Sequence, residues 1–228
     1  MTLVTRESYQ QSLDALRSDV CSMGALVVDR FEQALQSLAT RDERVARAVI
    51  DGDSEINERY LQLETQCVDL FALQQPVASD LRFITASFKI STDLERIGDL
   101  AVNLAQYALA AKHELVPELA VEEIGRDALA ALERSLSAYE TGETDVAREV
   151  VADDDEIDER CRTASETVTR DLIEREVDND GPWMVEQLLD DVTRVLLSIR
   201  DIERVADHAV NVAARTLYMV ENDPELIY

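Results

Sequence analysis

Apolar residues recur every three or four positions along most of the chain, which is the spacing of one buried helix face. The pattern predicts six helices: residues 6–39, a second from Val45 to Leu70, a third from Val77 to Leu109, then residues 118–140, 143–176 and 182–221. Gln75-Pro76 ends the second helix, and Thr141-Gly142 separates the fourth from the fifth. No alternation of period two persists, so we expect an all-α protein.

The two halves of the chain repeat each other. At an offset of 101 residues Gly24 corresponds to Gly125, and at an offset of 108 the segment from Asp93 to Asp99 corresponds to that from Asp201 to Asp207. The two offsets differ by seven residues, which is two helical turns, so equivalent residues stay on the same face of the helix. We therefore expect two tandem three-helix bundles related by pseudo-two-fold symmetry, in residues 1–113 and 114–228.

The charge balance excludes several functions. The 228 residues include 48 acids against 22 Lys and Arg, a net charge of −26. Such a chain repels nucleic acids and anionic membrane surfaces, so we expect neither as a partner. Lys89 and Lys112 are its only lysines. Strong acidity with so few lysines indicates a very salty cytoplasm, in which salt screens the self-repulsion, and hence a halophilic source.

The cysteines and the N-terminus indicate the compartment. Cys21, Cys67 and Cys161 are odd in number and form no C-x-x-C pair, so we expect free thiols in a reducing environment. The chain begins without a basic segment followed by an apolar one, and no run of roughly 18 apolar residues occurs. We expect a cytoplasmic protein without a signal peptide or membrane insertion.

Acidic residues interrupt the apolar stripes at equivalent places in both halves. Glu95 and Glu203 stand on the stripes of the third and sixth helices, each with an acid one turn later; the second and fifth helices supply a facing pair. The eight candidate ligands are Asp53, Asn57, Glu95, Asp99, Asp154, Asp158, Glu203 and Asp207. Oxygen donors of this kind suit magnesium, manganese or iron, and zinc less well, so we predict metal ions as cofactors, of unknown identity.

Two alternatives accompany the metal hypothesis. Glu95 could instead pair with Arg96 or Arg82 in an ordinary charge network. A ferritin-type iron protein would require E-x-x-H pairs, which are absent. His113 lies in a linker and His208 stands alone, so no catalytic set forms and we expect no enzymatic activity.

The motifs resemble those of the PhoU family. The resemblance rests on Gln75-Pro-Val-Ala-Ser-Asp-Leu-Arg82, Asp93-Leu-Glu-Arg-Ile-Gly-Asp-Leu-Ala-Val-Asn103 and Arg200-Asp-Ile-Glu-Arg-Val-Ala-Asp-His-Ala-Val-Asn211. It implies a regulator that represses phosphate uptake and the starvation response when phosphate is plentiful. Its expected partners are the cytoplasmic components of a phosphate ABC transporter, with a sensor kinase or other regulator in some members, and a second copy in a homodimer.

The same resemblance implies multinuclear metal clusters bound through E/D-x-x-x-D motifs. It assigns as ligands Asp53, Glu95 and Asp99 in the first repeat and Asp154, Asp158, Glu203 and Asp207 in the second. Asn57 departs from the acidic pattern and weakens the first site. With the charge balance, the resemblance points to a haloarchaeal member of the family. The alternative function is a carboxylate-bridged metal store or scaffold without phosphate signalling.

Overall fold

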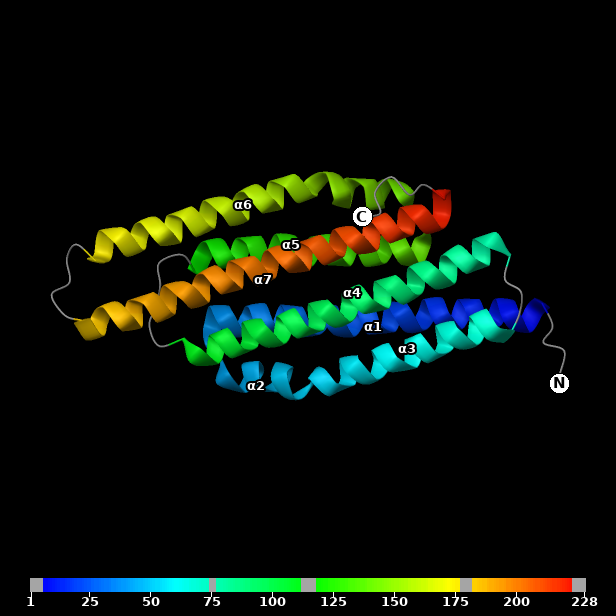
Figure 1. The fold of residues 1–228 in the computed structure, drawn as a ribbon, viewed down its shortest axis with the longest axis horizontal. Helices are drawn as coiled ribbons and strands as arrows, with labels where there is room; N and C mark the ends of the chain where they lie inside the picture. Colours follow the sequence, from blue (N-terminus) through cyan, green and yellow to red (C-terminus); the bar gives the residue numbers. More distant parts are fainter. Residues whose placement is uncertain (1–5, 74–76, 112–117, 177–181, 223–228) are drawn as a thin grey trace.

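The computed structural model describes residues 6–73, 77–111, 118–176 and 182–222. Within these ranges it contains α-helices and no strand, so the all-α prediction is confirmed (Figure 1). The helices are α1 (Arg6–Thr40), α2 (Glu43–Asp51), α3 (Asp53–Leu73), α4 (Ala78–Ala110), α5 (Glu118–Thr141), α6 (Thr144–Glu176) and α7 (Pro182–Glu221).

The second predicted helix is divided in two. Asp42 caps α2 by accepting hydrogen bonds from the backbone N–H groups of Arg44 and Val45. Gly52 ends α2 with φ −82° and ψ −5°, and α3 begins at the next residue, Asp53. The corresponding helix of the second half, α6, is continuous. The sequence pattern did not predict this break, which places Asp53 in the first turn of a helix.

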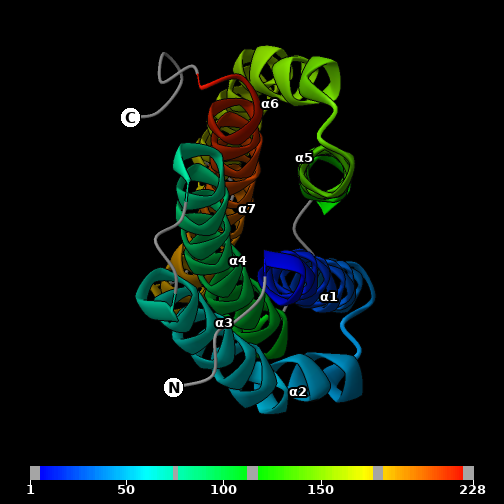
Figure 2. The same ribbon diagram turned by 90° about the vertical axis from the view of Figure 1, so that its right-hand side faces the viewer.

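The helices form two bundles that lie side by side. In one, α4 packs against α1, α2 and α3; in the other, α7 packs against α5 and α6. The bundles meet through α4 against α7 and α1 against α5, as the two views show (Figures 1 and 2). The predicted pair of three-helix bundles is therefore confirmed, with the second helix of the first bundle split. The predicted boundary between residues 113 and 114 falls outside the described residues.

Two reciprocal contacts show the pseudo-symmetry of the interface between α1 and α5. A Cβ atom added at Gly24 would lie 2.7 Å from Cδ2 of Leu136, and one added at Gly125 would lie 2.6 Å from Cδ2 of Leu35. These four residues are two equivalent pairs at the offset of 101. Each repeat thus inserts a leucine against the glycine of the other, which explains why both glycines recur in the sequence.

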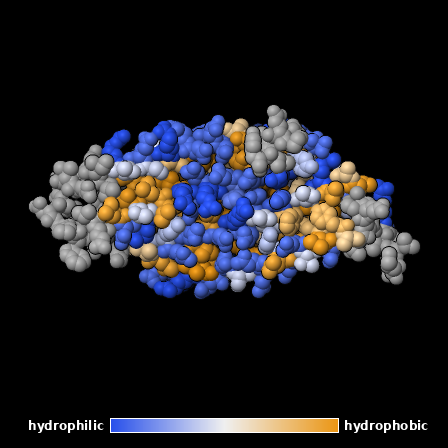
Figure 3. Space-filling model, in the orientation of Figure 1, coloured by the Kyte–Doolittle hydropathy of each residue, from blue (hydrophilic) through white to orange (hydrophobic). Residues whose placement is uncertain are grey.

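Burial separates an apolar interior from an acidic exterior. The core is continuous through both repeats and includes Phe31, Ile97 and Leu132, none of them exposed. Cys67 and Cys161 are buried and Cys21 is half-buried, all as free thiols. The face shown in Figure 3 is mostly hydrophilic, with apolar patches toward its ends. No helix among the described residues has an apolar stretch long enough to cross a membrane.

Candidate metal site

The second repeat brings its acidic residues together between α6 and α7. Asp154 and Asp158 stand one turn apart on α6, and Asp207 faces them from α7. One carboxylate oxygen from each of these three residues lies within 4.8 Å of the other two. Among the described residues this is the only group of three acids, histidines or cysteines so close together. Helical spacing on α6 and the pairing of α6 with α7 therefore build one compact oxygen cluster.

Burial and mutual repulsion raise the pKa of the carboxyl groups in this cluster. Burial, followed by the charges of Asp158 and Asp207, raises the pKa of Asp154 from 3.8 to about 6. Burial and the charge of Asp158 also raise the pKa values of Glu203 and Asp207. The Oδ1 atom of Asp154 is buried without a hydrogen-bond partner. Without a positive partner, the ionised cluster is electrostatically unfavourable.

These residues fit a hard cation. Carboxylate oxygens are the donors that Mg²⁺, Mn²⁺ and ferric iron prefer. A cation among Asp154, Asp158 and Asp207 would neutralise their repulsion and give the buried Oδ1 atom of Asp154 a partner. Glu203 stands one turn before Asp207 on α7 and lines the adjoining groove together with Asp158. It is therefore placed to supply a further oxygen.

The first repeat places its four candidates differently. The Nδ2 amide group of Asn57 donates a hydrogen bond of 2.9 Å to Oδ2 of Asp53, one turn away. Burial, followed by the charge of a neighbouring aspartate, raises the pKa values of Glu95 and Asp99 on α4. Asp53, Glu95 and Asp99 do not form a group as close as that of the second repeat. The asparagine thus gives Asp53 a hydrogen-bond partner, while the charge of Asp53 still acts on Glu95 and Asp99.

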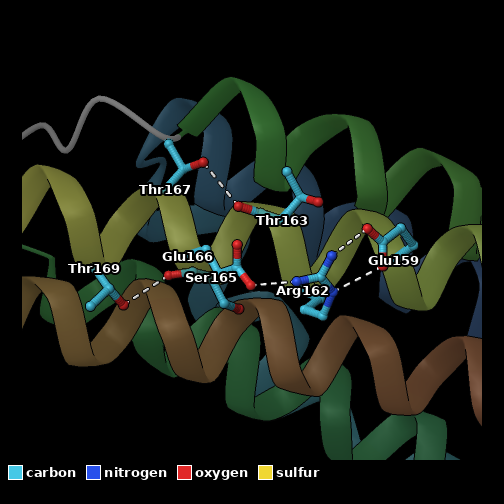
Figure 4. A network of polar contacts seen from close by, with 7 residues as sticks. All are labelled: Glu159, Arg162, Thr163, Ser165, Glu166, Thr167 and Thr169. Atoms are coloured by element: carbon cyan, nitrogen blue, oxygen red, sulfur yellow. Dashed lines mark hydrogen bonds and ion pairs between the residues drawn. The ribbon is translucent and has the colours of Figure 1, made fainter.

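Among the described residues no arginine forms an ion pair with the candidate acids of either repeat, although the charge of Arg204 acts to lower the pKa of Asp207. Within the described residues neither Arg82 nor Arg96 forms an ion pair with Glu95, although the charge of Arg96 acts to lower its pKa. In the second repeat Arg162 contributes to the groove beside Asp158 and Glu203, yet its guanidinium is held by Glu159 and Glu166 on the same helix (Figure 4). The metal hypothesis and the alternative of a charge network centred on Glu95 both stay predictions.

Two contacts between the repeats, one buried and one partly buried, escaped the sequence reasoning. Nδ1 of His208 lies 2.9 Å from Oδ1 of Asp93, and the Tyr107 hydroxyl donates a hydrogen bond of 3.0 Å to Oδ2 of Asp201. Asp93 and Asp201 occupy the same motif position in the two repeats. Each is the first residue of a motif whose later acids are candidate metal ligands. The carboxylates of Asp93 and Asp201 themselves make contacts between α4 and α7. The shared position was the only sequence signal for this role.

The arrangement defines an all-helical protein built of two equivalent bundles, with acids gathered between the last two helices of a bundle. A model of the PhoU domain family matches residues 20–108 and 121–216. The chain belongs to the PhoU family, whose characterised relatives are named as accessory proteins of phosphate transport.

Individual relatives match nearly the whole chain. It is 30% identical over 215 residues to the phosphate-specific transport system accessory protein PhoU of Serratia marcescens, covering 93% of this chain and 84% of the relative. It is also 30% identical to PhoU homolog 1 of Methanothermobacter thermautotrophicus, with 93% and 94% covered. The crystal structure of PhoU from Pseudomonas aeruginosa superposes with a TM-score of 0.85 at 28% identity, covering 94% of this chain and all of that one.

Proposed function

We propose that this protein is an adaptor that represses phosphate uptake and the starvation response when phosphate is plentiful. The observation that carries the proposal is the match of both repeats to accessory proteins of phosphate transport over almost their full length. The adaptor acts in the cytoplasm on the phosphate ABC transporter, and through it on a sensor kinase or another regulator. In this proposal it is an accessory protein and not an enzyme, as the names of its relatives suggest.

The second repeat binds the metal in this proposal. Asp154, Asp158, Glu203 and Asp207 hold the cation, which is magnesium, manganese, iron or zinc, and the groove leaves room for a multinuclear cluster. Bound metal stabilises the packing of α6 on α7 by mass action, so the surface presented to the partner depends on metal supply. Asp53, Glu95 and Asp99 form a weaker site, because Asn57 replaces an acid there.

A metal store or scaffold without phosphate signalling is the second candidate. The carboxylate cluster of α6 and α7 favours it, since the cluster does not itself require a transporter partner. The two functions differ in what loss of the protein does to phosphate uptake. A store would change the metal content of the cell and leave uptake unaltered.

Uptake of radiolabelled phosphate by a deletion strain in phosphate-rich medium tests the proposal. We expect faster uptake in the deletion strain than in the parent, restored by the wild-type gene. The variant Asp154→Asn/Asp207→Asn should restore it poorly. A matched control, Glu133→Gln/Glu140→Gln, removes two exposed acids of α5 and should restore it fully. Unchanged uptake in the deletion strain, together with no transporter component captured by the purified protein, would contradict the adaptor role.

A further inference from the structure

Exposed apolar side chains run along α3 to the start of α4. Leu61 and Val68 stand two turns apart on α3 and are 57% and 56% exposed, and Phe71 follows one turn later. Val77 and Leu81, at the start of α4, are exposed as well. We call these five residues the apolar surface; they are five of the seven large apolar side chains that are exposed among the described residues. In Figure 3 apolar side chains gather toward this end of the molecule. Such a gathering, unlike single exposed residues, marks an interaction site.

The fold itself does not require apolar side chains on this side of the helix. At the offset of 101 the second repeat has Arg162 where the first has Leu61, and Thr169 where the first has Val68. Arg162 and Thr169 line the open groove between α6 and α7, and Figure 4 shows them among other polar side chains of α6. The second repeat thus forms the same kind of bundle with polar residues at these positions. Packing within the bundle therefore does not account for Leu61 and Val68.

Acidic side chains border the apolar surface. The helix α3 carries five acids and a single base, Arg59, which pairs with Glu55. Helical spacing places Glu58 and Asp69 along one side of the apolar residues of α3, and Glu64 along the other side. Among the described residues no ion pair engages these three bordering acids. The surface therefore has an apolar centre and a negative border.

A second copy of the chain fits this surface poorly. A two-fold symmetric contact would bring the same acids against each other across the axis. The surface has five apolar residues, whereas a stable dimer interface contains about 20–30 residues on each side. An anionic membrane is repelled by the same acids. A helix that is apolar on one face and basic on both sides of that face complements the apolar centre and the negative border together.

We propose that the apolar surface of α3 and α4 docks a basic amphipathic helix of a partner protein. Apolar residues of that helix, one or two turns apart, pack on Leu61 and Val68, and its arginines or lysines pair with Glu64 and Asp69. The proposal rests on the adaptor role in one respect, that a partner exists, and it adds the chemistry of that partner and its place on the first repeat. The compact acid cluster lies on the second repeat, so docking and metal binding use different bundles.

Binding of a synthetic helix to the full-length protein tests the apolar contacts. The probe is a fluorescent peptide of about 18 residues, with leucines spaced three and four residues apart on one face and arginines beside them. Fluorescence anisotropy should show saturable binding. Leu61→Gln/Val68→Gln should weaken it at least about tenfold, because two apolar contacts are lost. Leu189→Gln/Val220→Gln changes two exposed apolar residues of α7 and is the matched control, which should bind as the wild type does. If Leu61→Gln/Val68→Gln does not fold, Thr65→Arg places a base on the same exposed side and should weaken binding equally.

Two further comparisons test the negative border and the amphipathic pattern. Glu64→Gln/Asp69→Asn should weaken peptide binding about threefold and make the affinity less dependent on salt, because two charge contacts are lost. A scrambled peptide of the same composition keeps the charge and loses the apolar face, so it should bind at least about tenfold more weakly than the ordered peptide.

Three results would overturn the proposal. They are no saturable binding of the peptide to the wild type, equal binding of the ordered and scrambled peptides, and equal binding to the wild type and to the folded Leu61→Gln/Val68→Gln variant. A homodimer that Leu61→Gln/Val68→Gln converts to monomers in light scattering would overturn it too, because a second copy would then cover the surface. Phosphate uptake by the deletion strain tests the adaptor role without this peptide, so the two proposals can fail separately.

Discussion

Removing the charge of Asp154 should stabilise the metal-free protein at neutral pH. Its folded-state pKa is raised from 3.8 to about 6, so the folded protein takes up a proton that the unfolded chain releases. The contribution of this group to folding is therefore fully present below pH 3.8 and is lost as the pH rises through about 6. At pH 7.5 the ionised Asp154 destabilises the metal-free fold, and Asp154→Asn abolishes that effect.

The magnitude follows from the pKa. A change from 3.8 to about 6 corresponds to about 3 kcal/mol at most, and because the side chain is only half-buried, solvent screening reduces this to about 1–2 kcal/mol. For a chain of 228 residues, that free energy raises the melting temperature by about 2–8 °C. Near pH 3.8, where the native carboxyl group is itself largely protonated, the gain should shrink.

Thermal melts with a chelator present, at fixed salt and over a pH series, measure this effect. Asp53→Asn is the matched control in the first repeat. It should give a smaller gain, because Asn57 already donates a hydrogen bond to Asp53. A melting temperature of Asp154→Asn equal to or below that of the wild type at pH 7.5 would refute the reasoning. A gain that does not vary with pH would refute it as well, since it would not come from ionisation.

Three further predictions concern the whole molecule. With a net charge of −26, the fold should melt at a clearly lower temperature in about 0.1 M salt than in multimolar salt, and equal melts would count against a halophilic adaptation. Light scattering in high salt should give a homodimer, and a mass of 25.6 kDa throughout a concentration series would disprove it. Gly125→Val should cost about 1–3 kcal/mol of stability, because its side chain would clash with Leu35; adding Leu35→Ala should recover part of that loss in a denaturant titration.

The helices could be predicted from the sequence because long amphipathic stripes determine helix type and approximate length. The division of the second helix at Gly52 could not. A glycine inside a helical pattern costs only about 1 kcal/mol, so the pattern alone does not tell a tolerated glycine from a break. The repeat could also be predicted from the sequence, because glycines recur at equivalent positions where no heptad pattern requires them. The structure gives the reason for this recurrence: Gly24 and Gly125 each face a leucine across the interface.

The candidate site was predictable in part. Spacing placed Asp154 and Asp158 on one face of α6, and the order of the helices brought Asp207 opposite them. The hydrogen bond that Asn57 makes to Asp53 depends on side-chain orientation, which spacing does not give. The contact between Asp93 and His208 depends on which faces of α4 and α7 meet, and this is decided by tertiary packing. The assignment of a metal to the site stays a prediction.

Elemental analysis of protein purified without an affinity tag, before and after chelation, tests the metal site most directly. The account predicts metal in the wild type, lost together with thermal stability on chelation. Glu203→Gln/Asp207→Asn should lower metal content and melting temperature more than Glu95→Gln/Asp99→Asn, because the closer cluster is in the second repeat. A metal-free wild type whose melt does not respond to chelator would contradict it.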